Sequence, residues 1–139
     1  MIKVGDFYEI EFSFTQEQVN DFCKISGDFN PLHWDVDFAA STPFKKPIIH
    51  GALIASVFSR VMGMEFPGSG SVYLKQVSEF KRPLFVGQTL NLSSGFESFQ
   101  KGLPFSTSGS IRAAGDSAPI ATNSACIASN MICNVVSRC

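Results

Sequence analysis

The chain has 139 residues, 45% of them hydrophobic, and its 11 basic residues nearly balance its 12 acidic ones, for a formal net charge of −1. This length fits a single domain over residues 1–139, and the charge balance excludes the broad basic surface on which nucleic-acid binding depends. No apolar run is long enough to span a bilayer and no signal peptide is visible, so we expect a cytoplasmic protein without membrane contact.

The first predicted elements are a strand and a helix. Residues 7–14 alternate between apolar and polar positions, which predicts a half-buried strand. Thr15 and Gln18 have the spacing of a capping box, which predicts a helix near residues 16–26. Gly27 is a suitable end for that helix.

A polar segment with several prolines follows over residues 27–47, and we expect one short helix inside it, at "DVDFAAS". Pro47 then precedes a helix of about 15 residues in "IIHGALIASVFSRVMGMEF". Its apolar residues cover most of the helix circumference, so we expect burial on nearly all sides. Ser56, Ser59 and Gly63 form a strip of small residues along it.

The rest of the chain is strand-like. Turn residues such as "PGSG" at 67–70 separate predicted strands at 71–80, 89–99, 104–114 and 118–128, and the tail "MICNVVSRC" fits a final strand or a frayed end. One central helix with antiparallel strands predicts an α+β domain whose sheet curls around the helix. The exposed edges of such a sheet favour pairing with a second copy.

Cysteine spacing indicates neither a metal site nor a disulfide framework. The four cysteines are Cys23, Cys126, Cys133 and Cys139, and no two of them form a C-x-x-C pair. The two histidines, His33 and His50, lie far from the cysteines in sequence. We therefore expect reduced thiols and no bound metal.

The loop "SGDFNPLHWD" at residues 26–35 combines Asp28 with His33. The two side chains can act as an acid–base pair if both reach one water or one substrate proton. Pro31 fixes its own φ and restricts Asn30, so backbone stiffness can hold the pair while Asn30 orients one member. The alternative is that Asp28 only forms a turn and that His33 is a partly buried structural histidine.

A second cluster, His50-Gly51, lies where the long helix is predicted to begin. Unpaired N–H groups at a helix N-terminus attract anions, and a glycine lets a substrate oxygen come close. An oxygen that develops negative charge on a thioester would be stabilised there. The alternative is that His50 only starts the helix and that Gly51 is a packing glycine.

The two clusters together resemble the hydratase signature of the MaoC-like family, the (R)-specific enoyl-CoA hydratases. That signature is a D-x-N-P-x-H loop, then a spacer that ends in proline, two aliphatic residues and His-Gly, as in "SGDFNPLHWDVDFAASTPFKKPIIHG". The resemblance covers residues 4–92, and beyond them only strand pattern and length agree. Trp34 departs from the family's pattern, where a smaller aliphatic residue is expected, which affects the shape of the pocket.

The resemblance implies a hot-dog fold, an antiparallel sheet wrapped around a long central helix, in a homodimer or larger homo-oligomer. It places catalytic roles on Asp28, His33 and Gly51. Substrate-side positions are Asn30, His50 and Ser59. The family offers no carry-over for the phosphates of coenzyme A. Candidate contacts are the cationic residues Lys45, Lys46, Lys75, Lys81 and Arg82, and the alternative is that they are only solvated surface charges.

The activity implied is the hydration of trans-2-enoyl-CoA to (R)-3-hydroxyacyl-CoA. It needs no metal or organic cofactor, since the coenzyme A belongs to the acyl-CoA substrate. A protonated Asp28 would need an apolar setting, for which Phe29, Phe38 and Phe44 are candidates. Three alternatives stay open: a hot-dog acyl-CoA thioesterase, a 3-hydroxyacyl-thioester dehydratase of fatty-acid synthesis, and a non-catalytic acyl-binding module. Acyl chain length and the carrier are not readable from the sequence.

Overall fold

The computed structural model describes residues 3–98 and 105–129. Its elements in chain order are β1 (Phe7–Phe12), α1 (Gln16–Ser26), the 3-10 turn η1 (Pro31–His33), α2 (Val36–Ser41), α3 (Gly51–Arg60), the π-helical turn η2 (Val61–Glu65), β2 (Ser71–Phe80), β3 (Leu90–Ser98), β4 (Phe105–Ala113) and β5 (Ala121–Ser129). The predicted elements are all present where they fall on described residues, and β5 begins three residues later than predicted. The tail at 131–139 and the turn at 100–104 lie outside the described residues.

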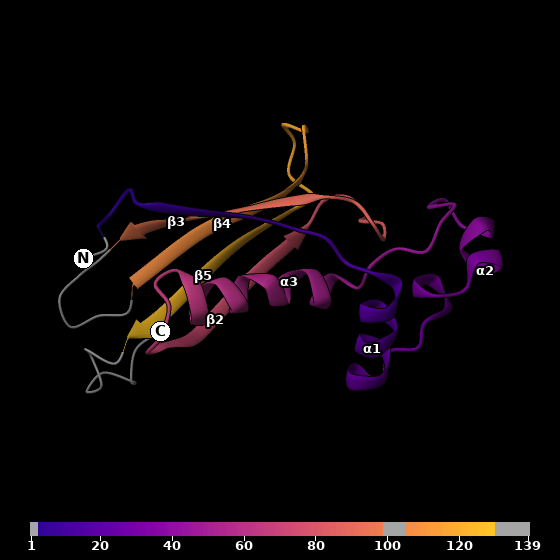
Figure 1. The fold of residues 1–139 in the computed structure, drawn as a ribbon, viewed down its shortest axis with the longest axis horizontal. Coiled ribbons are helices and arrows are strands. Elements are labelled where there is room, and N and C mark those ends of the chain that lie inside the picture. The colour runs from indigo at the N-terminus through magenta and orange to yellow at the C-terminus, as the bar shows by residue number, and fades with distance from the viewer. Residues whose placement is uncertain (1–2, 99–104, 130–139) are drawn as a thin grey trace.

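The five strands form one antiparallel sheet in the order β1-β3-β4-β5-β2. Helix α3 lies along one face of this sheet, and α1 and α2 extend beyond one end of it (Figure 1). This arrangement confirms the predicted α+β hot-dog architecture. In the part of the chain that the structure describes, no helix is long and apolar enough to cross a membrane.

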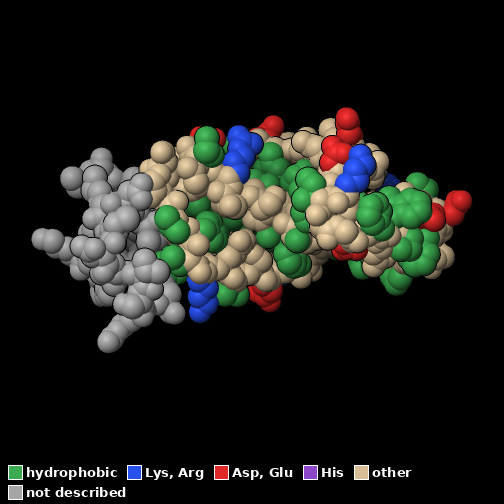
Figure 2. All heavy atoms as spheres, turned by 90° about the horizontal axis from the view of Figure 1, so that it is seen from below, with side chains coloured by type: hydrophobic (Ala, Val, Ile, Leu, Met, Phe, Trp, Pro, Cys, Tyr) green, Lys and Arg blue, Asp and Glu red, His purple; other side chains and the backbone are tan. Residues whose placement is uncertain are grey.

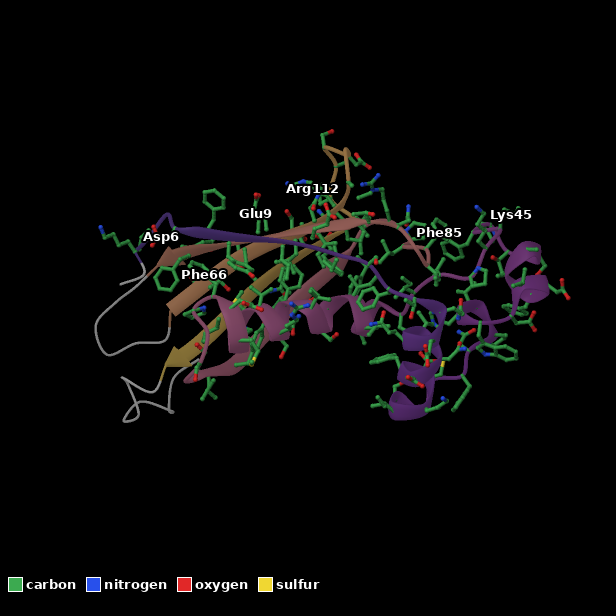
Figure 3. The ribbon with its side chains drawn as sticks, viewed as in Figure 1. Asp6, Glu9, Lys45, Phe66, Phe85 and Arg112 are labelled. Atoms are coloured by element: carbon green, nitrogen blue, oxygen red, sulfur yellow. The ribbon has the colours of Figure 1, made fainter. Side chains whose placement is uncertain are left out.

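Alternation in β1 places its apolar side chains on the α3 side of the sheet. Tyr8, Ile10 and Phe12 pack against the buried core, as predicted. Tyr8 also stacks on Phe66, which follows η2, with 6.3 Å between the ring centroids. Figure 3 shows Phe66 on the α3 side of the sheet and Arg112 on the opposite side.

Helix α3 buries one face rather than its whole circumference. Ile54, Val57 and Phe58 are buried, and Val61 and Met62 continue this face into η2. The opposite face, with Ser56 and Ser59, is exposed. The prediction of burial on nearly all sides is therefore wrong for the single chain, because the sheet reaches only one side of the helix.

Phe58 fits against the sheet because β4 has a glycine opposite it. A Cβ atom at Gly109 would lie 2.7 Å from Cε1 of Phe58 and 2.7 Å from the carbonyl oxygen of Ser93. Neither distance is compatible with a side chain, so α3 can approach the sheet this closely only at a glycine.

The two described cysteines differ in state. Cys23 is free and buried on α1, in agreement with the prediction. Cys126 on β5 takes part in a disulfide, so the expectation of reduced thiols is wrong at this position. The spacing of the cysteines did not indicate this bond, and the partner of Cys126 is not among the described residues.

Candidate active site

The loop that carries the site begins where α1 ends. The capping box is present: Gln18 N donates to Thr15 Oγ1 at 3.2 Å, and Thr15 N donates to Gln18 Oε1 at 2.9 Å. Gly27 ends the helix with a left-handed φ of 76°, a conformation that glycine adopts without strain. The chain leaves α1 at this turn and enters the loop at Asp28.

Two consecutive side-chain turns then set the loop geometry. Asn30 N donates to Asp28 Oδ1 at 3.1 Å, and Leu32 N donates to Asn30 Oδ1 at 3.1 Å. Pro31 occupies the first position of η1, which ends at His33, where the lack of an N–H costs nothing. The backbone of Asn30 therefore holds Asp28, while its side chain caps the turn that carries His33. Asn30 was predicted to orient Asp28 or His33 by a hydrogen bond. Its side chain bonds instead to the backbone N–H of Leu32, in the turn that carries His33.

The acid and the imidazole converge. Oδ2 of Asp28 lies 4.0 Å from Nε2 of His33, and the side chains are 53% and 11% exposed. His33 Nδ1 lies 2.7 Å from the carbonyl oxygen of Ile48. Since a carbonyl can only accept, Nδ1 carries the proton, and in the neutral ring Nε2 presents its lone pair toward Asp28.

A second imidazole lies beneath the first. The rings of His33 and His50 stack with 3.6 Å between centroids and 25° between planes, and Phe22 contacts His50 edge-on at 5.0 Å. His50 Nε2 lies 3.2 Å from the main-chain oxygen of Asp28 and 3.9 Å from its Oδ2. With 3% exposure, His50 lies under the pair instead of at the substrate surface predicted for it. Burial lowers the pKa of His50, and its hydrogen bond to Asp28 offsets this in part.

Gly51 begins α3, as predicted. His50, the residue before the helix, makes no side-chain cap hydrogen bond, so no side chain of the N-cap satisfies the first N–H groups of α3. A cavity of about 330 Å³ adjoins this helix tip and is lined by Gly51, Phe44, Phe80 and Lys81 among others. The tip is thus open to a ligand, although Asp28 and His33 are not among the residues that line this cavity.

Phe80, at the end of β2, is a contact that the sequence did not indicate. A Cβ atom at Gly51 would lie 2.9 Å from Cε2 of its ring. The ring of Phe80 therefore lies against the one residue at the helix tip that has no side chain. Because strand β2 starts 20 residues after Gly51 in the chain, only the folded packing reveals the pair.

Ser59 is the predicted site residue that the structure does not bring to the pair. It lies eight residues after Gly51 on the exposed face of α3, about 12 Å along the helix axis. Its predicted place beside the substrate stays a prediction, which an extended acyl or pantetheine group along α3 would satisfy.

The predicted cationic contacts differ in how far they are already engaged. Arg82 binds Asp116 at 2.7 Å and also donates to the carbonyl oxygen of Ala118, which ties it to the β4–β5 turn. Lys81 pairs with Glu79 at 3.1 Å. Arg82 is therefore better described as a residue that holds the β4–β5 turn in place than as a phosphate ligand.

Asp28, His33 and His50 also form a group of three potential metal ligands, whose atoms lie within 4.8 Å of one another. A single ion would need the lone pairs of both imidazoles to converge on it. Stacked rings with 25° between their planes direct their in-plane lone pairs side by side. His50 Nε2 is moreover occupied by the main-chain oxygen of Asp28. The arrangement fits proton transfer better than metal binding, and the expectation that no metal is required stays a prediction.

The chain as a whole is similar to several known proteins. The model of the MaoC like domain family matches residues 6–102. An (R)-specific enoyl-CoA hydratase of Aeromonas caviae is 41% identical over 106 residues, which are 76% of this chain and 79% of the relative. A mitochondrial 3-hydroxyacyl-[acyl-carrier-protein] dehydratase of Arabidopsis thaliana is 33% identical over 90 residues, which are 65% of this chain and 53% of that relative.

Among solved structures, the fold is similar to that of an (R)-hydratase from A. caviae described as involved in PHA biosynthesis. The TM-score is 0.86 at 36% sequence identity, and the match covers 91% of this chain and 96% of that one. The family match includes the whole of the Asp28–Gly51 segment described above. The chain therefore belongs to the MaoC-like family.

Proposed function

We propose that this protein is an (R)-specific enoyl-CoA hydratase, a hydro-lyase that adds water to trans-2-enoyl-CoA to give (R)-3-hydroxyacyl-CoA. The observation that carries the proposal is the 4.0 Å separation between Oδ2 of Asp28 and Nε2 of His33. One water that makes two hydrogen bonds of about 2.8 Å can bridge such a gap. The relative with 41% identity is named for the same activity.

The tautomer of His33 defines its part in the reaction. Because Nδ1 donates to Ile48 O, Nε2 is free to take a proton from the bridging water while the water oxygen bonds to the β-carbon of the enoyl group. The α-carbon gains a proton, so that one O–H bond and the C=C π bond break while one C–O and one C–H bond form. Asp28 and His33 share these two proton transfers, and the thioester stays intact throughout.

The N-terminus of α3 serves the carbonyl end of the substrate. As the water adds, negative charge develops on the thioester oxygen, and the Gly51 N–H at the first position of α3 stabilises this charge in the proposed mechanism. The cavity beside Gly51 gives the thioester access to this position. We propose that the reaction uses no metal or organic cofactor and that the coenzyme A is part of the substrate.

We further propose that the working unit is a homodimer or larger homo-oligomer. In the single chain the Asp28 side chain is 53% exposed, and the three phenylalanines expected to shield it are themselves exposed. Figure 2 shows hydrophobic side chains gathered at the end of the molecule that carries α1 and α2. The exposed apolar residues of this end include Ile25, Phe29, Trp34, Val36 and Phe38. A second copy packed there would supply the water-poor setting that a proton-donating carboxyl needs.

Two neighbouring reactions are the alternatives within the same fold. The Arabidopsis relative is named for dehydration of a 3-hydroxyacyl group on acyl carrier protein, which is the reverse chemistry on another carrier and would use the same residues. A thioesterase would instead cleave the C–S bond. A non-catalytic acyl-binding module has no use for an Asp28–His33 pair held at this distance.

The test is a crotonyl-CoA assay with chiral analysis of the 3-hydroxybutyryl product. We expect loss of the enoyl absorbance, formation of the R product and no release of free CoA thiol. Asp28→Asn and His33→Gln should each reduce kcat by at least about 100-fold with an unchanged thermal transition. Asp37→Asn, an exposed acid on α2, is the matched control and should keep full activity. Full activity in either site variant would remove the pair from the mechanism, and thiol release would identify a thioesterase.

A further inference from the structure

The feature that the proposed mechanism leaves unused is His50. It is 3% exposed, so a substrate in the site cannot touch its ring. Yet it contacts both members of the pair, through the stacked ring of His33 and through the main-chain oxygen of Asp28. A buried polar side chain of this kind is retained at a cost unless its hydrogen bonds do something specific.

We propose that His50 is a positioning residue that sets the distance between Asp28 and His33, by donating a hydrogen bond to the backbone of one and supporting the ring face of the other. The inference rests on the proposed hydratase function, since it concerns the same pair. It assigns His50 a role other than the substrate contact expected from the sequence.

The hydrogen bonds of His50 determine its tautomer. Nε2 lies 3.2 Å from the main-chain oxygen of Asp28, and because that oxygen can only accept, Nε2 carries the proton. Nδ1 is buried and has no hydrogen-bond partner among the described residues. A proton on Nδ1 would be a buried donor without an acceptor, which is costly. The ring is therefore neutral and protonated at Nε2 only.

The surroundings of His50 also keep its ring uncharged. The titratable groups that face His50 are Cys23 of α1, with Sγ 3.8 Å from Nε2, Asp28 of the loop and His33 of η1. Burial is the main cause that keeps the pKa of His50 below its ordinary value; the hydrogen bond to Asp28 and the charge of Asp28 offset this in part, while the neighbouring His33 lowers the pKa further. When His33 takes up a proton during the reaction, the ring beneath it stays uncharged and presents a π face to the new cation.

The geometric consequence concerns Asp28. Its carboxylate is held on one side by Asn30 N, through Oδ1, and its main chain is held on the other by His50 Nε2. Without the second contact, the loop keeps the hydrogen bonds of Asp28 N to Ser26 Oγ and of Trp34 Nε1 to Phe29 O but loses the one that joins Asp28 to the start of α3, so Asp28 can shift relative to His33. A displacement of about 1 Å between reacting groups is enough to reduce turnover about 100-fold.

The kinetic test uses two substitutions. His50→Phe keeps the ring stacked on His33 but removes the donor to Asp28, and we expect kcat to fall about 10- to 100-fold with KM within about threefold. His50→Gln retains a neutral N–H donor and should restore most of kcat. Val19→Ala, a core change on α1 at a side chain with 0% exposure, is the control that lowers stability without touching the pair and should leave kcat unchanged.

The spectroscopic test does not depend on activity. The chain has 2 histidines, so ¹⁵N-histidine NMR of the wild type yields one imidazole for each position, assigned through His50→Gln. We expect neutral His50 to be the Nε2–H tautomer and its pKa to lie below the ordinary value for histidine. A neutral His50 protonated at Nδ1, or wild-type kcat in His50→Phe, would overturn the proposal. If only the proposed hydratase function is wrong, the wild type will not turn over crotonyl-CoA but the NMR result will be as expected. The two proposals can therefore fail in distinguishable ways.

Discussion

The loop region and the sheet of this protein are held by different kinds of interaction. Between Thr15 and Phe38, side chains hydrogen-bond to backbone groups two or three residues away, as in Asp28–Asn30 and Asp35–Phe38. In the sheet, the partners lie far apart in the chain: β2 pairs with β5, so that Val77 faces Ser124. The site residues Asp28 and His33 lie in the region held by local hydrogen bonds, whereas the sheet is held by pairing between distant segments.

This difference explains which part of the protein tolerates which change. A local turn depends on one acceptor atom and its loss costs one hydrogen bond. A packed face depends on the shapes of several residues that meet only after folding, so that a single added atom disturbs all of them. Substitutions in the sheet should therefore affect stability most, and substitutions in the loop should affect activity most.

The largest effect is expected from Gly109→Ala. The new Cβ would lie 2.7 Å from the Ser93 carbonyl oxygen and from the ring of Phe58, and a backbone atom cannot move aside cheaply. We expect the free energy of unfolding to fall by about 1–3 kcal/mol, measured by urea denaturation.

Gly95→Ala is the matched control on the neighbouring strand. Its Cβ would have no atom closer than the Asp6 carbonyl oxygen at 3.9 Å, which is an ordinary contact, so the change should be within about 0.5 kcal/mol. Equal losses for the two alanines would mean that the close approach of α3 at Gly109 is not what restricts this position.

The sequence predicted the local region well. Three local features were predicted correctly: the Thr15–Gln18 capping box, the end of the helix at Gly27 and the turn at Pro31. Each depends on conformational preferences that act within a few residues. The alternation of β1 was readable for the same reason. The convergence of Asp28 and His33 followed from the stiffness of this loop.

What the sequence did not predict depends on packing between distant segments. The one-sided burial of α3 and the contact of Phe80 with Gly51 both arise from sheet geometry. His50 was expected at the substrate surface because only its position before the helix was visible. That position is equally compatible with a ring turned inward under His33, and only the fold decides between the two.

Asn30→Ala and Asp35→Ala separate effects on stability from effects on activity within the loop region. Each removes a side-chain acceptor for a backbone N–H, that of Leu32 at 3.1 Å and that of Phe38 at 3.0 Å. Each should lower the free energy of unfolding by about 1 kcal/mol. Only Asn30→Ala loosens the turn that carries His33, and we expect kcat to fall about tenfold or more there but to stay at the wild-type level in Asp35→Ala. Equal activities of the two variants would show that the turn does not position His33.

The smallest effect is the pH dependence that His50 gives to stability. Burial lowers its pKa in the folded chain, so over the range just below about pH 6.5 the unfolded chain binds a proton there that the folded chain does not. The stabilisation is fully present above this pH and is lost as the pH falls, by at most about 1.4 kcal/mol per pH unit. Urea midpoints at about pH 7.5 and 5.5 measure it, and His50→Gln should show a smaller decrease than the wild type because its side chain does not titrate. The same decrease in both proteins would assign the pH dependence to other groups and leave His50 without an unusual pKa.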